Sequence, residues 1–141
     1  MSRVFWDAML FIYLLEGHPR FAPAVLAVLA QSRRRGDVLF TSYLSLAEAS
    51  VGMPGGETSA IILRKTLDEM GFTLVSFDDE SVEPFRRLRA EFGLKSPDSL
   101  HLACAAANKT DLFLTGDKQL LKKRLHVPGI QFIADFENPP F

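Results

Sequence analysis

The sequence predicts an α/β fold, a three-layer α/β/α sandwich with a mostly parallel central sheet of four or five strands. Short apolar runs alternate along the chain with longer segments of helical period. Each gap between two runs is long enough for a helical crossover and far longer than a hairpin turn, which favours parallel pairing. Turn formers such as Gly17-His18-Pro19 and Pro54-Gly55-Gly56 stand where helices should end.

Five short runs rich in apolar and β-branched residues predict the strands. In chain order they cover Arg3 to Trp6, Val38 to Thr41, Phe72 to Phe77, Leu112 to Thr115 and Ile130 to Ile133.

Seven segments between and after these runs predict helices, because apolar residues recur in them every three to four positions. They cover Ala8 to Glu16, Phe21 to Arg35, Tyr43 to Gly52, Thr58 to Met70, Ser81 to Phe92, Pro97 to Asn108 and Lys118 to Leu125. Gly36-Asp37 and Gly71 mark the ends of the second and the fourth. Asp78-Asp79 suits the cap of the fifth, and Ser96 suits the cap of the sixth, with Pro97 at its first helical position.

Length and composition exclude several classes of protein. The 141 residues suffice for one compact domain, residues 1–141, and not for two. A net charge of −1 excludes a polycation that binds nucleic acid by bulk charge, and 48% hydrophobic residues argue against intrinsic disorder. The single cysteine, Cys104, and three scattered histidines form neither a disulfide nor a zinc site. We therefore expect a cytoplasmic protein.

Two apolar stretches near the amino terminus, Met9 to Leu15 and Phe21 to Ala30, are each too short to span a membrane. Asp7 precedes the first stretch and the charged segment Glu16 to Arg20 separates the two, so no membrane association is expected. The stretches form either the core of the sandwich or a patch that a partner covers, and the sequence alone favours the core.

Acidic residues stand at the ends of two predicted strands and at the start of a third element. Asp7 follows the first strand directly, Asp117 follows the fourth after one glycine, and Asp98 lies in the first turn of a helix. Because parallel sheets bind ligands outside the carboxyl ends of their strands, these carboxylates are candidates for a site. For any one of them alone, the simpler explanation is a helix cap or a first-turn acid stabilised by the helix dipole.

Glu48 is harder to explain as a structural residue. It lies four positions after Leu44 and three before Val51, on the helix face that turns toward the protein. A buried carboxylate is protonated, paired or bound to a metal. Its partner would be either a cation such as a nearby arginine, a helix-start amide, or a metal ion.

Four carboxylates from separate segments can therefore converge on one pocket at the sheet edge. Such a cluster repels itself unless a cation fills it, and ligands that are all oxygen select hard ions such as Mg²⁺ or Mn²⁺. An ion held in this way can activate water and stabilise the charge that develops on a phosphate. The sequence thus points to hydrolysis of a phosphodiester.

The ordered set of motifs around these acids resembles the PIN domain, and in length its single-domain branch, the VapC-like ribonuclease toxins of bacterial toxin-antitoxin pairs. The motifs are Val4-Phe5-Trp6-Asp7, Leu46-Ala47-Glu48, Ser96-Pro97-Asp98-Ser99-Leu100-His101-Leu102-Ala103 and Phe113-Leu114-Thr115-Gly116-Asp117. Together they extend over most of the chain.

The resemblance implies an endoribonuclease that depends on Mg²⁺ or Mn²⁺ and that forms a homodimer. Asp7 and Asp98 would be the principal metal ligands, Glu48 and Asp117 would complete the acidic pocket, and Thr115 would supply a supporting hydroxyl. The implied partners are an RNA substrate and a cognate antitoxin that inserts a peptide near the pocket. One departure concerns Met9, since many relatives have Ser, Thr or Asn two residues after the first Asp.

Two other classes of protein compete with the nuclease. A phosphoryl-transfer domain also uses strand-end acids with Mg²⁺, but it needs a second acid beside the nucleophile, and Asp7 has none. A scaffold that binds RNA or protein without turnover would lack one of the four acids, and none is missing. His101, three residues after Asp98, could carry a proton, although a structural histidine is the simpler explanation.

Three basic clusters are available to hold an RNA backbone, although solvated surface is the usual meaning of such runs. They are Arg33-Arg34-Arg35, Arg86-Arg87 with Arg89, and Lys122-Lys123-Arg124.

Overall fold

A computed structural model describes all residues from Met1 to Phe141. In chain order its elements are β1 (Arg3–Trp6), α1 (Ala8–Glu16), α2 (Phe21–Arg35), β2 (Val38–Ser42), α3 (Tyr43–Val51), a 3₁₀ turn (Gly56–Thr58), α4 (Ser59–Glu69), β3 (Phe72–Val75), α5 (Asp79–Phe92), α6 (Ser96–Ala107), β4 (Thr110–Thr115), α7 (Lys118–Lys122) and β5 (Ile130–Asp135). None of the helices is both long enough and apolar enough to traverse a bilayer.

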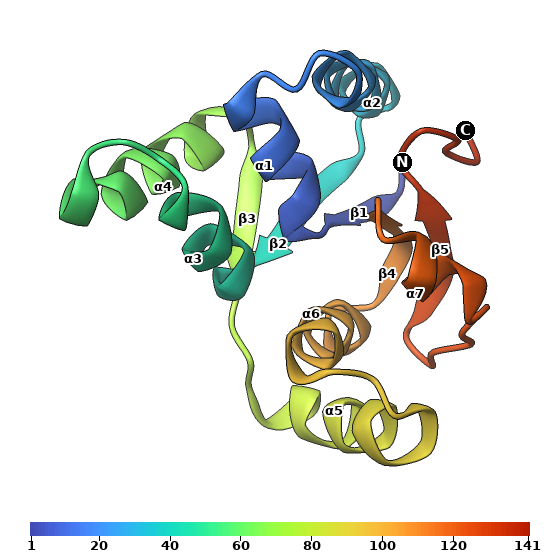
Figure 1. The fold of residues 1–141 in the computed structure, drawn as a ribbon. Coiled ribbons are helices and arrows are strands. Elements are labelled where there is room, and N and C mark those ends of the chain that lie inside the picture. The colour runs from blue at the N-terminus through green and yellow to red at the C-terminus, as the bar shows by residue number, and fades with distance from the viewer.

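The strands form one sheet in the order β3-β2-β1-β4-β5, and every neighbouring pair is parallel. The predicted α/β/α sandwich is therefore confirmed, with five strands. Helices α1 to α4 lie on one side of the sheet, and α5 and α6 cover the other (Figure 1).

The two faces of the sheet bury separate hydrophobic cores, because successive side chains of a strand point to opposite sides. In β1, Val4 and Trp6 pack into the core beneath α1, α2 and α4, whereas Phe5 packs into the core beneath α5 and α6. Both cores are rich in aromatic residues, and Phe5 stacks on Phe113 of β4 with ring centroids 5.1 Å apart. The strand β1 is completely buried between them from Val4 onward.

The limits of several elements differ from those predicted, for local reasons. Strand β3 ends at Val75 rather than Phe77, because its register partner Ser42 is the last residue of β2. Helix α7 ends at Lys122 rather than Leu125, since Arg124 has a φ of +49°. Helix α6 begins at Ser96, so that Lys95 rather than Ser96 occupies the cap position.

The strand order places a topological switch point between β1 and β4. After β1 the chain continues toward one edge strand of the sheet, through β2 to β3. After β4 it continues toward the opposite edge strand, β5. Connections that diverge in this way open a crevice outside the carboxyl ends of the two strands, where ligands of such sheets bind. Asp7 and Asp117 both follow these two strand ends.

Candidate active site

Four elements bring the predicted site residues to the carboxyl edge of the sheet. Asp7 caps α1 after β1, Asp117 caps α7 after β4, Asp98 lies in the first turn of α6, and Glu48 lies on α3. In Figure 1, the start of α1, the helices α3 and α6 and the short helix α7 surround this edge.

Asp7 is the most deeply placed of these acids, with an exposed fraction of 9%. Its Oδ1 accepts a hydrogen bond of 2.9 Å from the Met9 amide, as expected for an N-cap, and its Oδ2 accepts one from the Thr115 hydroxyl. Burial raises the pKa of Asp7 to about 6, and the charge of Asp117 contributes in the same direction. The side chain is thus an ionisable group held in an apolar surrounding.

Thr115 joins Asp7 to Asp117. It is the last residue of β4 and fully buried; its hydroxyl donates to Asp7 and accepts a hydrogen bond of 3.1 Å from the Asp117 amide. The Asp117 carboxylate in turn accepts from the amides of Gln119 and Leu120 at 3.0 and 3.2 Å. Met9, which stands where many relatives have a polar side chain, gives Asp7 only a backbone hydrogen bond. The side-chain hydroxyl that bonds to Asp7 comes instead from Thr115 on the neighbouring strand.

Asp98 is partly buried at the start of α6, and the charges of other acids act on it. Burial raises its pKa, and the charges of Asp117 and Glu48 raise it further. Asp117 also acts on Asp7, so the carboxylates are close enough to influence one another electrostatically. Asp117 thus acts on both Asp7 and Asp98, and Glu48 acts on Asp98.

Glu48 does not pair with an arginine or a helix-start amide, as a structural explanation had suggested. Its Oε1 lies 2.7 Å from Nε2 of His101, and its side chain retains 38% exposure, so it is less buried than the sequence indicated. His101 is itself buried and hydrogen-bonded. His101 is therefore buried, as expected of a structural histidine. Its hydrogen-bond partner, however, is Glu48, one of the candidate site acids.

The donors of the site are carboxylate oxygens, which is the ligand type that hard divalent cations prefer. None of the arginine or lysine side chains forms an ion pair with Asp7, Asp98 or Asp117, so these carboxylates lack a protein counter-ion. No three acidic, histidine or cysteine side chains are close enough to enclose an ion among themselves. Mg²⁺ commonly binds through one or two carboxylates and keeps several waters, which matches an open set of oxygen donors.

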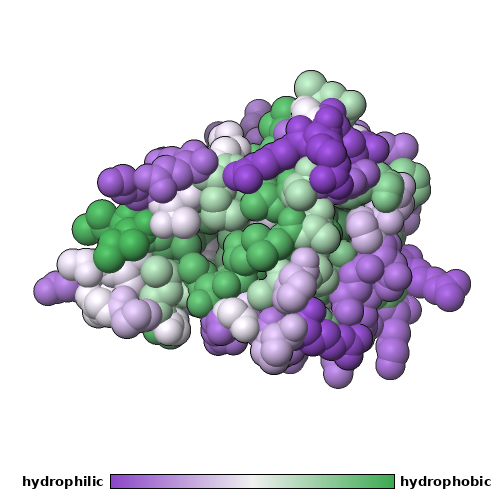
Figure 2. Space-filling model, turned by 90° about the horizontal axis from the view of Figure 1, so that it is seen from above, coloured by the Kyte–Doolittle hydropathy of each residue, from purple (hydrophilic) through white to green (hydrophobic).

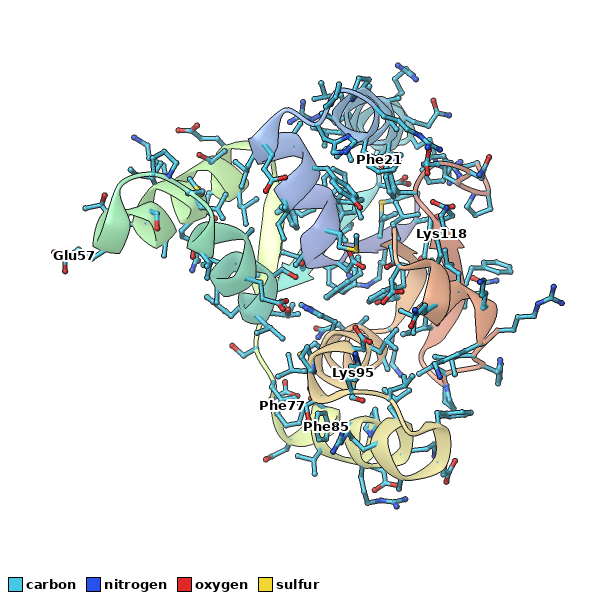
Figure 3. All side chains as sticks on the ribbon, viewed as in Figure 1. Phe21, Glu57, Phe77, Phe85, Lys95 and Lys118 are labelled. Carbon is cyan, nitrogen blue, oxygen red and sulfur yellow. The ribbon has the colours of Figure 1, made fainter.

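Sequence reasoning missed the polar residues that support the site and the cations beside it. Ser42 and Ser45 both face Nδ1 of His101, and only the packing of α3 against α6 reveals this. Lys95 is close enough to Asp98 to lower its pKa, and Lys118 follows Asp117 directly. Figure 3 labels these two lysines at the starts of α6 and α7.

Two of the three basic clusters of the sequence are placed less favourably for contact with the acids, whereas Lys122, Lys123 and Arg124 follow at the end of the short helix that Asp117 caps. Arg33, Arg34 and Arg35 form the last turn of α2, which leads into the start of β2 and hence lies at the opposite edge of the sheet. On α5, Arg86 and Arg87 pair with glutamates of the same helix.

Comparison with known proteins identifies the family of the chain. The model of the PIN domain family matches residues 4–124, and the chain therefore belongs to the PIN domain family. The resemblance seen in the motifs is thereby confirmed. No curated protein matches the sequence significantly.

Several solved structures share the fold at low sequence identity. VapBC2 from Rickettsia felis, bound to a DNA fragment from its promoter, has a TM-score of 0.71 at 17% identity, over 94% of this chain and 97% of that chain. DNA-bound VapBC from Salmonella typhimurium has a TM-score of 0.70 at 14% identity, over 96% and 99%. A toxin-antitoxin complex from Klebsiella pneumoniae has a TM-score of 0.63 at 22% identity, over 92% and 95%.

Replacing Asp7 by Asn should stabilise the metal-free protein at pH 8. The pKa of Asp7 is about 6 in the folded chain, against 3.8 for an ordinary aspartate in water. Its ionisation therefore lowers stability as the pH rises from about 4 to about 6, and the loss is complete above that range. At about 1.4 kcal/mol per pH unit, the gain in unfolding free energy is at most about 3 kcal/mol. Urea unfolding at several pH values measures it.

Asp117→Asn is the matched control, since it changes a second helix cap of the same site that is less buried. Asn is as good a cap as Asp, so neither variant loses its helix start. The advantage of Asp7→Asn should shrink as the pH falls and vanish only well below the ordinary pKa of 3.8, where the carboxyl is protonated in both the folded and the unfolded state. An Asp7→Asn protein no more stable than the wild type at pH 8 would contradict the proposed burial of charge.

Proposed function

We propose that residues 1–141 act as a single nuclease domain, a Mg²⁺- or Mn²⁺-dependent endoribonuclease that serves as the toxin of a toxin-antitoxin pair in the cytoplasm. The observation that carries the proposal is that a PIN-family fold places Asp7 and Asp117 just beyond the ends of β1 and β4, with no lysine or arginine ion pair to either, and that Asp117 acts electrostatically on both Asp7 and Asp98. The similarity to VapBC structures supports the assignment to a toxin-antitoxin pair.

In this proposal Asp7 and Asp98 are the principal ligands, and Glu48 and Asp117 complete the acidic pocket. A bound divalent ion would supply an activated water and would stabilise charge at the phosphate. Asp7 is fixed by the Met9 amide and the Thr115 hydroxyl, so its carboxylate is oriented before any ligand arrives. Preorientation of this kind lowers the cost of binding.

The RNA backbone would meet lysines beside the acids. Lys118 is 60% exposed and is held by Asp135 and Glu137 at the end of β5, and Lys95 is exposed at the start of α6. Both cations can turn to a phosphate from the rim of the site. Because an acidic pocket repels a polyanion, such neighbouring cations are needed for RNA to approach it.

Asp98→Asn should reduce cleavage of single-stranded RNA by about 100-fold or more, because it removes the charge of a principal ligand. Cleavage is measured with purified protein in Mg²⁺ or Mn²⁺, and EDTA should abolish it. Asp98 makes no hydrogen bond that holds the fold, so circular dichroism should stay unchanged and the unfolding temperature should not fall, since the lost charge was an unfavourable one.

Asp68→Asn on the exposed face of α4 provides the control, since Asp68 lies in another part of the molecule and pairs only with Arg64. Cleavage that survives in an Asp7→Asn, Asp98→Asn double variant would refute the nuclease. Calorimetric titration that finds no Mn²⁺ uptake by the wild type would favour the non-catalytic scaffold instead. A phosphorylated protein after incubation with a phosphodonor would favour the phosphoryl-transfer domain.

An apolar groove supports the proposed antitoxin partner. It lies between α1 and α3, has a volume of about 340 Å³, and is lined by Ile12, Leu15, Glu16, Glu48, Ala49, Val51, Gly52, Met53 and Pro54. The groove therefore extends to one of the site acids. The two apolar stretches of the sequence are mostly core, with Leu10 and Val25 fully buried, but Leu15 and Leu26 remain exposed.

Exposed apolar side chains occur on both α3 and α4. Val51 of α3 is 85% exposed, and Ile61 of α4 is 71% exposed. Figure 2, which views the molecule from above, shows apolar residues gathered in the middle and at the left of the face seen there. A segment of a partner that occupied the groove would cover this surface and reach Glu48, which would explain inhibition of the site.

Val51→Asp should weaken binding of the antitoxin at least tenfold, because an apolar contact is replaced by a charge that the partner must bury. The candidate partner is the product of the reading frame next to the gene, produced together with this chain. Affinity is measured by calorimetry and inhibition by the RNA assay. Phe132→Asp on the exposed side of β5 is the control. Equal weakening by both substitutions would place the partner elsewhere.

The homodimer expected from the family resemblance stays a prediction. Phe77 and Val82, both exposed around the start of α5, are available for such a contact. Light scattering during gel filtration measures the mass of the free protein and tests it.

A further inference from the structure

His101 lies within the acidic site without being one of its proposed ligands. It occupies α6 one turn after Asp98 and is only 5% exposed. Its Nε2 is 2.7 Å from Oε1 of Glu48, and its Nδ1 is 3.0 Å from Oγ of Ser42 and 3.4 Å from Oγ of Ser45. Both ring nitrogens are therefore occupied, one by a site acid and the other by buried hydroxyls.

The hydrogen-bond network assigns the hydrogen on Nε2. A carboxylate only accepts, so a separation of 2.7 Å requires Nε2 to donate to Glu48. In the neutral ring, Nδ1 then accepts from the Ser42 hydroxyl; in the charged ring, Nδ1 donates to the same oxygen. Nε2 donates to Glu48 in both protonation states of the ring. The contact between His101 and Glu48 therefore does not depend on whether the ring is neutral or charged.

The partners on the far side of the ring are themselves fixed. Ser42 ends β2 and caps α3, where its hydroxyl accepts a hydrogen bond of 3.2 Å from the Ser45 amide. The ring also contacts Phe5 of β1 edge-on, with centroids 6.5 Å apart. The imidazole is thus held by a strand end, a helix start and a core aromatic residue. It cannot follow Glu48 if that side chain turns away.

Glu48, in contrast, depends on His101 for its orientation. The Glu48 side chain is 38% exposed, whereas that of His101 is 7% exposed. His101 is the only hydrogen-bond partner of the Glu48 carboxylate. A glutamate on an exposed helix surface samples many rotamers, whereas one bound to a fixed donor is restricted to a few.

We infer that His101 is a positioning residue that holds the Glu48 carboxylate toward the ion-binding acids, through the chain Ser42, His101 and Glu48. This inference rests on the proposed function, since it assumes that Glu48 takes part in binding the ion. Groups that orient metal ligands in this way typically contribute 10- to 100-fold to metal affinity or activity. Ser42 is the second member of the same chain, although it contacts no acid itself.

Two amide substitutions at position 101 distinguish the contribution of Nε2 from that of Nδ1. The amide nitrogen of Gln reaches about as far as Nε2 and can still donate to Glu48, whereas that of Asn reaches only about as far as Nδ1. His101→Asn should therefore weaken Mn²⁺ binding about tenfold or more, and His101→Gln should keep affinity close to that of the wild type. Calorimetric titration with Mn²⁺ alone measures both, and thermal unfolding shows that each variant is folded.

The outcomes distinguish positioning from packing. Rescue by Gln but not by Asn supports the inference, since both variants remove the buried ring. Equal loss in both variants, or no loss in either, overturns it. Ser42→Ala, which leaves Nε2 and Glu48 in place, should give a smaller loss than His101→Asn.

A second measurement does not require metal or activity. The proton on Nε2 of His101 should give a slowly exchanging resonance in the NMR spectrum of the metal-free protein, shifted downfield by its charged acceptor. Glu48→Gln should move that resonance upfield, and the matched control Glu57→Gln, in the distant 3₁₀ turn before α4 in Figure 3, should not. If the chemical shift of this proton is the same in the wild type and in Glu48→Gln, the inference is overturned. Wild-type protein that binds no Mn²⁺ would instead contradict the proposed function, and the resonance alone would then decide whether His101 fixes Glu48.

Discussion

The parallel pairing of β1 with β4 is the constraint on which the site depends. It sets Trp6 beside Leu114, so that the residues after them, Asp7 and Thr115, meet at the carboxyl edge of the sheet. The Asp7 amide completes the ladder with a hydrogen bond of 3.1 Å to the Leu114 carbonyl. A shift of one residue in this register would turn the side chains of β1 to the wrong faces and separate the acid from its hydroxyl.

The side chains of the candidate site have structural roles beside the chemical ones proposed for them. Asp7 and Asp117 both cap helices, so the structural explanation of these residues is correct and does not compete with the functional one. Capping fixes the carboxylates where strand gives way to helix, and burial of Asp7 in the absence of a counter-ion leaves its charge unfavourable. A cation that bound there would relieve this cost, which links the local folding of the chain to the proposed chemistry.

Support for the site comes from the two helix layers on opposite faces of the sheet. Glu48 belongs to α3 on one face, and His101 belongs to α6 on the other, yet they meet across the end of β2. Ser42 stands at that strand end and contacts the same ring. The carboxyl edge is therefore the one place where the two layers touch through polar groups, and their relative position sets the geometry of the acids.

The sequence by itself determined the fold class, the order of the elements and which acids stand at strand ends and helix starts, because apolar periodicity and capping are local properties of the chain. It identified Asp7 and Asp117 as neighbours, since parallel strands end at a common edge. Only the tertiary structure decided that Glu48 pairs with His101, that Thr115 bonds to Asp7, and that Lys95 and Lys118 are the cations beside the acids. These contacts join residues that lie far apart in the chain, and their distances depend on how helices pack across the sheet, which no local pattern encodes.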